Sequence, residues 1–108
     1  MSPRLLPTAV RLAGKPVLRA QSDERLTQLT REGSAAAFEV IVTRYRRPLL
    51  RHCAHVLGDV DAEDAVQDAF VKAHVALAKG EHVRKLGPWL YAVAHNAAIS
   101  LLRGQREP

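Results

Sequence analysis

Apolar side chains recur every three to four residues along most of the chain, and no segment shows the strict alternation of a β-strand. The pattern is longest over residues 34–57, and shorter versions cover residues 22–33, 61–78 and 88–104. Because a 3.6-residue period collects apolar side chains on one face of an α-helix, the sequence predicts an all-α fold. We expect a compact bundle of three main helices with one short leading helix.

Polar residues and helix breakers indicate where these helices begin and end. Ser22, Ser34 and Asp61 are the expected N-caps of the first three helices, since each can accept a hydrogen bond from the following turn. Pro88 suits the first position of the fourth helix, and Gly104 should end it.

The second helix should be the longest. Pro48 removes one backbone donor and should bend it near its middle, and Gly58 should stop it. The predicted core consists of the apolar stripes of the four helices: Leu26, Leu29; Phe38, Ile41, Val42, Tyr45, Leu49, Cys53, Val56, Leu57; Ala62, Val66, Ala69, Phe70, Ala73, Leu77; Leu90, Val93, Ala94, Ala97 and Leu101.

Composition supports one small domain with an aliphatic core. Of 108 residues, 47% are hydrophobic but only 5% are aromatic. The single cysteine excludes an intramolecular disulfide and favours a reducing cytoplasm. No apolar run approaches the roughly 20 residues that span a bilayer, so we expect no membrane association. Prolines interrupt residues 1–20, which argues against a signal peptide.

Residues 1–21 are basic and lack a helical period, and we interpret them as a flexible tail before a domain at residues 22–106. A misassigned start codon and a DNA-contacting arm are alternatives for this segment. Charge is unevenly placed: residues 1–20 carry +4, residues 61–78 carry −3 and residues 79–108 carry +3. This asymmetry suggests two different partners, one of them polyanionic.

The acidic third helix has a second face opposite its core stripe. An ordinary solvated face would mix Lys with Glu, whereas this one combines acids, an amide and valines, as a docking surface for a basic partner does. Asp61 and Glu63 are better explained as acids that complement the helix N-terminus. The face consists of Asp64, Gln67, Asp68, Val71 and Val75.

Three motifs occur in a fixed order: "RYRRPL" in the second helix, "DAEDAVQDAF" in the third and "WLYAVAHN" in the fourth. Together they resemble region 2 of bacterial extracytoplasmic-function (group IV) RNA polymerase sigma factors, over about residues 22–106. The resemblance implies a transcription initiation factor without catalytic residues or cofactor. An anti-sigma factor is a plausible further partner.

In that family the acidic helix docks on the clamp helices of the polymerase beta prime subunit, which implies polymerase contacts at Asp64, Gln67, Asp68 and Val71. The following loop and fourth helix face the −10 promoter element and melt it. The implied DNA-binding residues are Lys79, His82, Arg84, Lys85, Trp89, Asn96 and Arg103.

Chemistry supports part of this assignment. Long cations in the loop can hold phosphates without reading sequence. Asn96 can pair with an adenine edge, or instead brace the loop, and Trp89 often packs at such a position. The loop departs from the family because Gly80 and Leu86 stand where many members have Phe. His74 stands where Trp is common, so the base-capture residues differ here.

Other interpretations remain open. "HVALAKG" resembles a histidine phosphotransfer module, although its lysine falls five residues after His74 instead of three. A regulator that binds polymerase without DNA is a second alternative. The cluster His52, Cys53 and His55 lacks a second ligand pair at zinc-finger spacing, so we expect no metal site and assign Cys53 to the core.

Intact family members carry a second domain, a helix-turn-helix that reads the −35 element. The sequence stops where the linker to that domain should begin. We therefore expect either a fragment of a two-domain protein or a variant that consists of region 2 alone.

Overall fold

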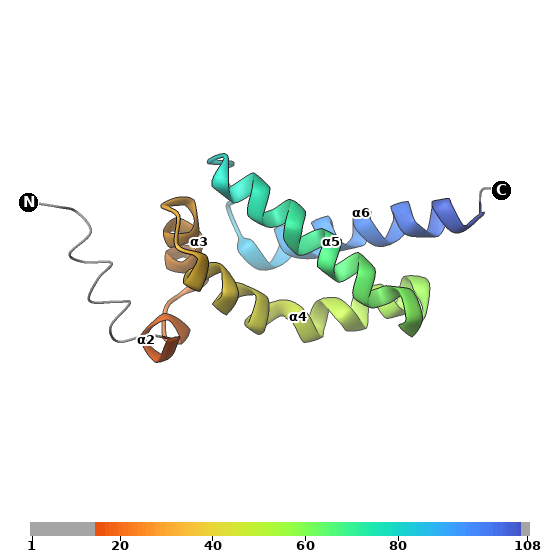
Figure 1. Ribbon diagram of the computed structural model, residues 1–108, viewed down its shortest axis with the longest axis horizontal. Helices are drawn as coiled ribbons and strands as arrows, with labels where there is room; N and C mark the ends of the chain where they lie inside the picture. The colour runs from red at the N-terminus through yellow and green to blue at the C-terminus, as the bar shows by residue number, and fades with distance from the viewer. Residues whose placement is uncertain (1–14, 107–108) are drawn as a thin grey trace, which may run out of the picture.

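The structure, a computed structural model, describes residues 15–106. These residues contain no strand, which confirms the predicted all-α fold (Figure 1). The helices in chain order are α2 (Lys15–Arg19), α3 (Asp23–Arg31), α4 (Ala35–Leu57), α5 (Asp59–Ala78) and α6 (Leu86–Arg106).

Three long helices form the bundle, and each of α4, α5 and α6 packs against the other two. Gly58 joins α4 to α5 with a φ of 85°, a conformation that favours glycine. Because this connection is so short, α5 folds back along α4 (Figure 1). The short helix α3 packs at one end of the bundle, where it contacts all three long helices.

The core is aliphatic, as the composition predicts. Leu49, Leu77 and Leu90 are fully buried and come from three different helices. Burial of one such side chain contributes about 1.5–3 kcal/mol. Alanines on the facing surfaces let the helices approach closely; the buried ones are Ala37, Ala62, Ala65, Ala69, Ala73, Ala94, Ala97 and Ala98.

Two of the three predicted N-caps are confirmed. Ser22 Oγ accepts a hydrogen bond from the Arg25 backbone N–H at 3.1 Å, and Ser34 Oγ accepts one from the Ala37 N–H at 3.0 Å. The prediction for Asp61 is wrong. Helix α5 begins at Asp59, Gly58 is its N-cap without a side-chain bond, and Asp61 lies inside the first turn. There its charge still complements the helix dipole.

Both predicted ends of α6 are also wrong. It begins at Leu86, so Pro88 is its third residue, a position where a missing N–H costs no intrahelical bond. Gly104 lies within the helix, which continues to Arg106. An exposed glycine weakens a helix by about 1 kcal/mol but does not end it. Pro48 likewise lies inside the continuous helix α4.

The N-terminal segment differs from the expected tail where the structure describes it. Residues 15–19 form α2, and Leu18 is only 3% exposed because α2 packs on α4. Arg44 of α4 donates hydrogen bonds of 3.0 Å to the carbonyls of Arg19 and Gln21 and so fixes this segment. The rest of the predicted tail, residues 1–14, lies outside the described residues. No helix within residues 15–106 has the length and hydropathy to cross a membrane.

Candidate functional site

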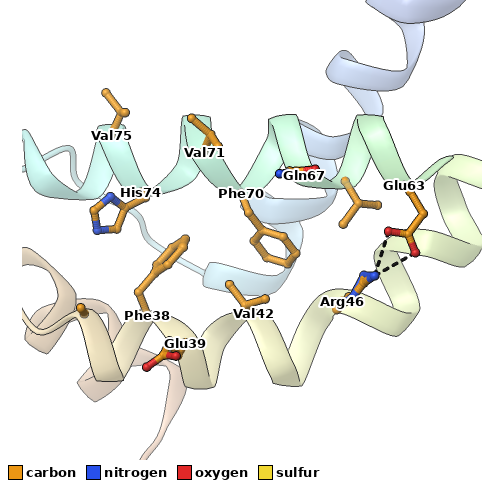
Figure 2. Close-up of a pocket in the computed structure, with 12 residues that line it drawn as sticks. Phe38, Glu39, Val42, Arg46, Glu63, Gln67, Phe70, Val71, His74 and Val75 are labelled. Carbon is orange, nitrogen blue, oxygen red and sulfur yellow. Dashed lines mark hydrogen bonds and ion pairs between the residues drawn. The ribbon is translucent and has the colours of Figure 1, made fainter. Parts of the chain in front are cut away.

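A groove of about 570 Å³ runs between α4 and α5 on the surface of the bundle. Figure 2 shows Phe38 and Val42 of α4 opposite Phe70 of α5. The Phe38 and Phe70 rings meet edge to face, with centroids 6.3 Å apart. The groove is thus an apolar trough that the bundle leaves open to solvent.

Charged and polar side chains border this trough. At one end Arg46 Nη2 lies 2.8 Å from both carboxylate oxygens of Glu63 (Figure 2). Near the other end the His74 ring contacts Phe38, with centroids 4.8 Å apart. An apolar floor with a charged border suits an amphipathic helix from a partner.

The predicted docking residues Asp64, Gln67, Asp68 and Val71 are all exposed, and Val71 is 57% exposed. They spread over an arc of about 100° on α5. Gln67 and Val71 line the groove, together with the 45% exposed Val75. Large apolar side chains exposed side by side on a small domain are typical of an interface.

Asp68 lies at the edge of this arc that faces α6, whereas Gln67 lies at the edge beside the groove. It lines a shallow hollow with Ala97 and Leu101 of α6, and its carboxylate lies 2.8 Å from Lys72 Nζ. An exposed ion pair between residues i and i+4 contributes only about 0.3–0.5 kcal/mol. Asp68 can therefore exchange Lys72 for a partner cation at little expense.

The loop between α5 and α6 presents the predicted cations at the C-terminal end of α5. Lys79, His82, Arg84 and Lys85 are all exposed. The guanidinium of Arg31 holds the loop in place, because it donates hydrogen bonds of 3.2 and 3.1 Å to the Glu81 carbonyl. The loop is thus tethered to α3 while its long cations extend into solvent.

A second hollow, of about 290 Å³, lies beneath this loop. It is bordered by Arg84 and Lys85 of the loop and by Asp23 and Tyr45 of the bundle. Arg44 donates a 2.7 Å hydrogen bond to one Asp23 oxygen, and the Tyr45 hydroxyl donates to the other. Burial, and then the bond to Asp23, raise the pKa of Tyr45 to about 12.

Helix α6 supplies the remaining predicted DNA contacts. Trp89 is half-buried against the core, whereas Asn96 and Arg103 are exposed. These residues are seven apart, so they follow one flank of the helix. No acid occurs in the sequence of α6, and its polar flank therefore carries only neutral and positive groups.

Comparisons with known proteins identify the family of the chain. Residues 41–107 match the family Sigma-70 region 2. The chain belongs to the sigma-70 region 2 family. It is 34% identical over 84 residues to the ECF RNA polymerase sigma factor SigW of Bacillus subtilis, which covers 77% of this chain and 44% of SigW.

Two further relatives of the region 2 domain are similar at the same level. The RNA polymerase sigma-H factor of Pseudomonas aeruginosa is 32% identical over 95 residues, 85% of this chain and 49% of that protein. The ECF RNA polymerase sigma-E factor of Escherichia coli K12 is 32% identical over 89 residues, 81% of this chain and 47% of that protein. The chain spans about half the length of these relatives.

The sequence predicts the outer face of α5 in this region 2 domain but not the groove beside it. Phe38 and Val42 were assigned to the core stripe, yet both are half-buried and line the groove. No signal in the sequence marks them, because both positions fall near the middle of the predicted α4 stripe. The prediction for Cys53 is confirmed, since it is fully buried and burial raises the pKa of its thiol.

The departures from the family pattern have a structural counterpart. Leu86 is 5% exposed and begins α6, so its side chain belongs to the core. Gly80 has a φ of 87° and closes the end of α5, a conformation that a phenylalanine would rarely adopt. His82 remains an exposed ring in the loop.

Proposed function

We propose that this region 2 domain joins core RNA polymerase to the −10 element of a promoter and helps to open the DNA there. The observation that carries the proposal is the separation of two surfaces. The outer face of α5 combines exposed acids with exposed valines beside an apolar groove, whereas the loop and α6 expose cations.

Polymerase binding is assigned to Asp64, Gln67, Asp68 and Val71. A basic amphipathic helix, such as the beta prime clamp helices that the resemblance implies, fits this face for two reasons. Its apolar side chains can enter the groove along Val71, and its cations can meet Asp64 and Asp68. An anti-sigma factor that blocks transcription would compete for the same groove.

DNA binding is assigned to the exposed loop cations and to the outer flank of α6. Lys79, Arg84, Lys85 and Arg103 would hold phosphates, and a ring N–H of His82 would donate a hydrogen bond to one of them. Asn96 would read a base edge, and Trp89 would offer the exposed part of its ring for stacking. RNA polymerase and its promoters place this activity in the cytoplasm.

The decisive experiment exchanges charge on the docking face. Asp64→Arg should reduce co-purification of core RNA polymerase at least tenfold, because a cation would meet the basic partner surface. Glu32→Arg makes the same charge change at the exposed end of α3 and serves as the matched control. Equal binding by both variants would remove the polymerase assignment from α5.

Two alternatives are separated by further measurements. A histidine phosphotransfer module would accept phosphate on exposed His74 from a phosphorylated response regulator, whereas we expect no transfer. A polymerase regulator without DNA binding would keep the α5 contact but show no affinity for −10 single-stranded DNA. We favour DNA binding because α6 lacks acids and the loop cations extend into solvent.

A further inference from the structure

The fold brings together two histidines that are 43 residues apart in the sequence. His52 Nε2 of α4 lies 3.0 Å from His95 Nδ1 of α6. The ring centroids are 5.2 Å apart, and Tyr91 contacts the His52 ring edge to face. His52 is half-buried and His95 is exposed, so the pair stands on the surface where solvent can reach it.

Neither imidazole serves an ion pair or a buried network. Within residues 15–106 the two rings have no hydrogen-bond partner other than each other. Helix α6 contains no acid, and Glu39, the single acid of α4, lies more than three turns before His52. Two adjacent imidazoles without a carboxylate partner cannot form an ion pair with an acid. Their ring nitrogens are instead the ligands that divalent transition metals prefer.

We propose that His52 and His95 form a two-ligand site for a borderline divalent transition metal such as Zn²⁺ or Ni²⁺. Metal–imidazole distances are about 2.0–2.1 Å. With the nitrogens 3.0 Å apart, such a metal would subtend an angle of roughly 94° at the two ligands. That angle matches neighbouring positions of octahedral or square-planar coordination. An increase of about 0.3 Å in the separation gives the tetrahedral angle.

Binding changes the tautomer of one ring but not the total number of protons. In the metal-free pair one ring N–H donates to the other ring's lone pair. In the bound pair both inner nitrogens are ligands, so that proton moves through solvent to the outer nitrogen of its own ring. Each ring turns so that its lone pair points to the metal, which His95 can do freely because it is exposed.

Water completes the coordination in this proposal. Residues 15–106 contain no group of three or more His, Cys, Asp and Glu side chains that could hold a metal. The site is therefore open, and its imidazole ligands should prefer Ni²⁺ and Zn²⁺ over Mg²⁺ and Ca²⁺, which require oxygen. A bound metal would tie α4 to α6 and stabilise the folded chain by mass action. This inference does not depend on the proposed function.

The test uses the untagged full chain after EDTA treatment and removal of the chelator. Calorimetric titration with Zn²⁺, and separately with Ni²⁺, should show one ion bound per chain, and Mg²⁺ should show none. His52→Ala and His95→Ala should each weaken binding by at least about tenfold. His55→Ala is the matched control, since it removes an exposed histidine one turn away on the same helix, and it should bind like the wild type.

A second variant separates metal binding from folding. His52→Asn keeps a side chain that can hydrogen-bond His95 but removes a metal ligand, so it should fold normally and lose metal-dependent stabilisation. In the wild type, Ni²⁺ should broaden the ring resonances of His52 and His95 before those of the other three histidines. The proposal is overturned if the wild type binds neither ion. It also fails if His52→Asn keeps full affinity, or if His55→Ala loses as much affinity as His52→Ala.

Discussion

The carboxylate of Asp23 receives hydrogen bonds from two neighbouring residues of α4, Arg44 and Tyr45. It thereby fixes the start of α3 beside the hollow under the α5–α6 loop. Gly87 contributes to this junction by its lack of a side chain: a Cβ there would lie 3.2 Å from the Tyr45 hydroxyl oxygen. The sequence marks Asp23 only as a first-turn acid, because its partners lie more than 20 residues away.

The raised pKa of Tyr45 makes this junction sensitive to alkaline pH. The folded pKa of about 12 exceeds the usual 10.0, so the hydroxyl's contribution is complete below pH 10 and is lost as pH rises through 12. Tyr45→Phe should destabilise the domain by about 1–2 kcal/mol at pH 8, and the difference from wild type should shrink above pH 10. Urea denaturation from pH 8 to 11 measures this, with Tyr91→Phe as the control. A difference that stays constant with pH would contradict the assigned bond.

Helix α5 shows how far a pattern of residues can be interpreted at the scale of an element. Its inner stripe is confirmed because burial follows directly from helical period: Val66 is 2% exposed and Leu77 is fully buried. The predicted N-cap of α5, Asp61, is wrong because Gly58 both ends α4 and caps α5. No room is left for the loop that we expect before Asp61. Helix ends depend on such neighbours. Which residues share a face of a helix follows from the helical period alone.

Two identical substitutions on α5 test its two faces. Val66→Asp places an unpaired charge in the core and should unfold the domain or destabilise it by at least about 3 kcal/mol. Val71→Asp changes an exposed side chain and should alter stability by less than about 0.5 kcal/mol, yet weaken polymerase binding at the groove. Circular dichroism melts and a polymerase pull-down measure the two effects. Normal polymerase binding by folded Val71→Asp would exclude the groove from the interface.

At the scale of the whole molecule, the sequence predicts the helical bundle and the uneven distribution of charge along the chain. It does not predict the sites that form where two helices pack together. The α4–α5 groove is lined by Phe38 of one helix and Val71 of the other, and the imidazole pair consists of His52 from α4 and His95 from α6. Neither juxtaposition follows from spacing along one helix, because each depends on how two helices cross and on their rotation about their axes. From the sequence alone, His52 therefore groups with its neighbour His55, and nothing in the spacing connects it with His95.

The exposed cations of the α5–α6 loop also allow a prediction about how affinity for DNA depends on salt concentration. If the loop holds single-stranded −10 DNA through phosphates, Arg84→Ala combined with Lys85→Ala removes two contacts. Each phosphate contact on a single strand contributes about 0.7 to the slope of log affinity against log salt concentration, so the slope should fall by about 1.4. Lys72→Ala removes an exposed cation from the middle of α5, away from the loop, and should leave the slope unchanged. Fluorescence anisotropy at roughly 50 to 300 mM salt, a range over which log affinity falls linearly with log salt concentration, compares the three proteins. An equal slope in all three would mean that the loop cations do not touch the nucleic acid, and the positive surface would have to be sought elsewhere on the bundle.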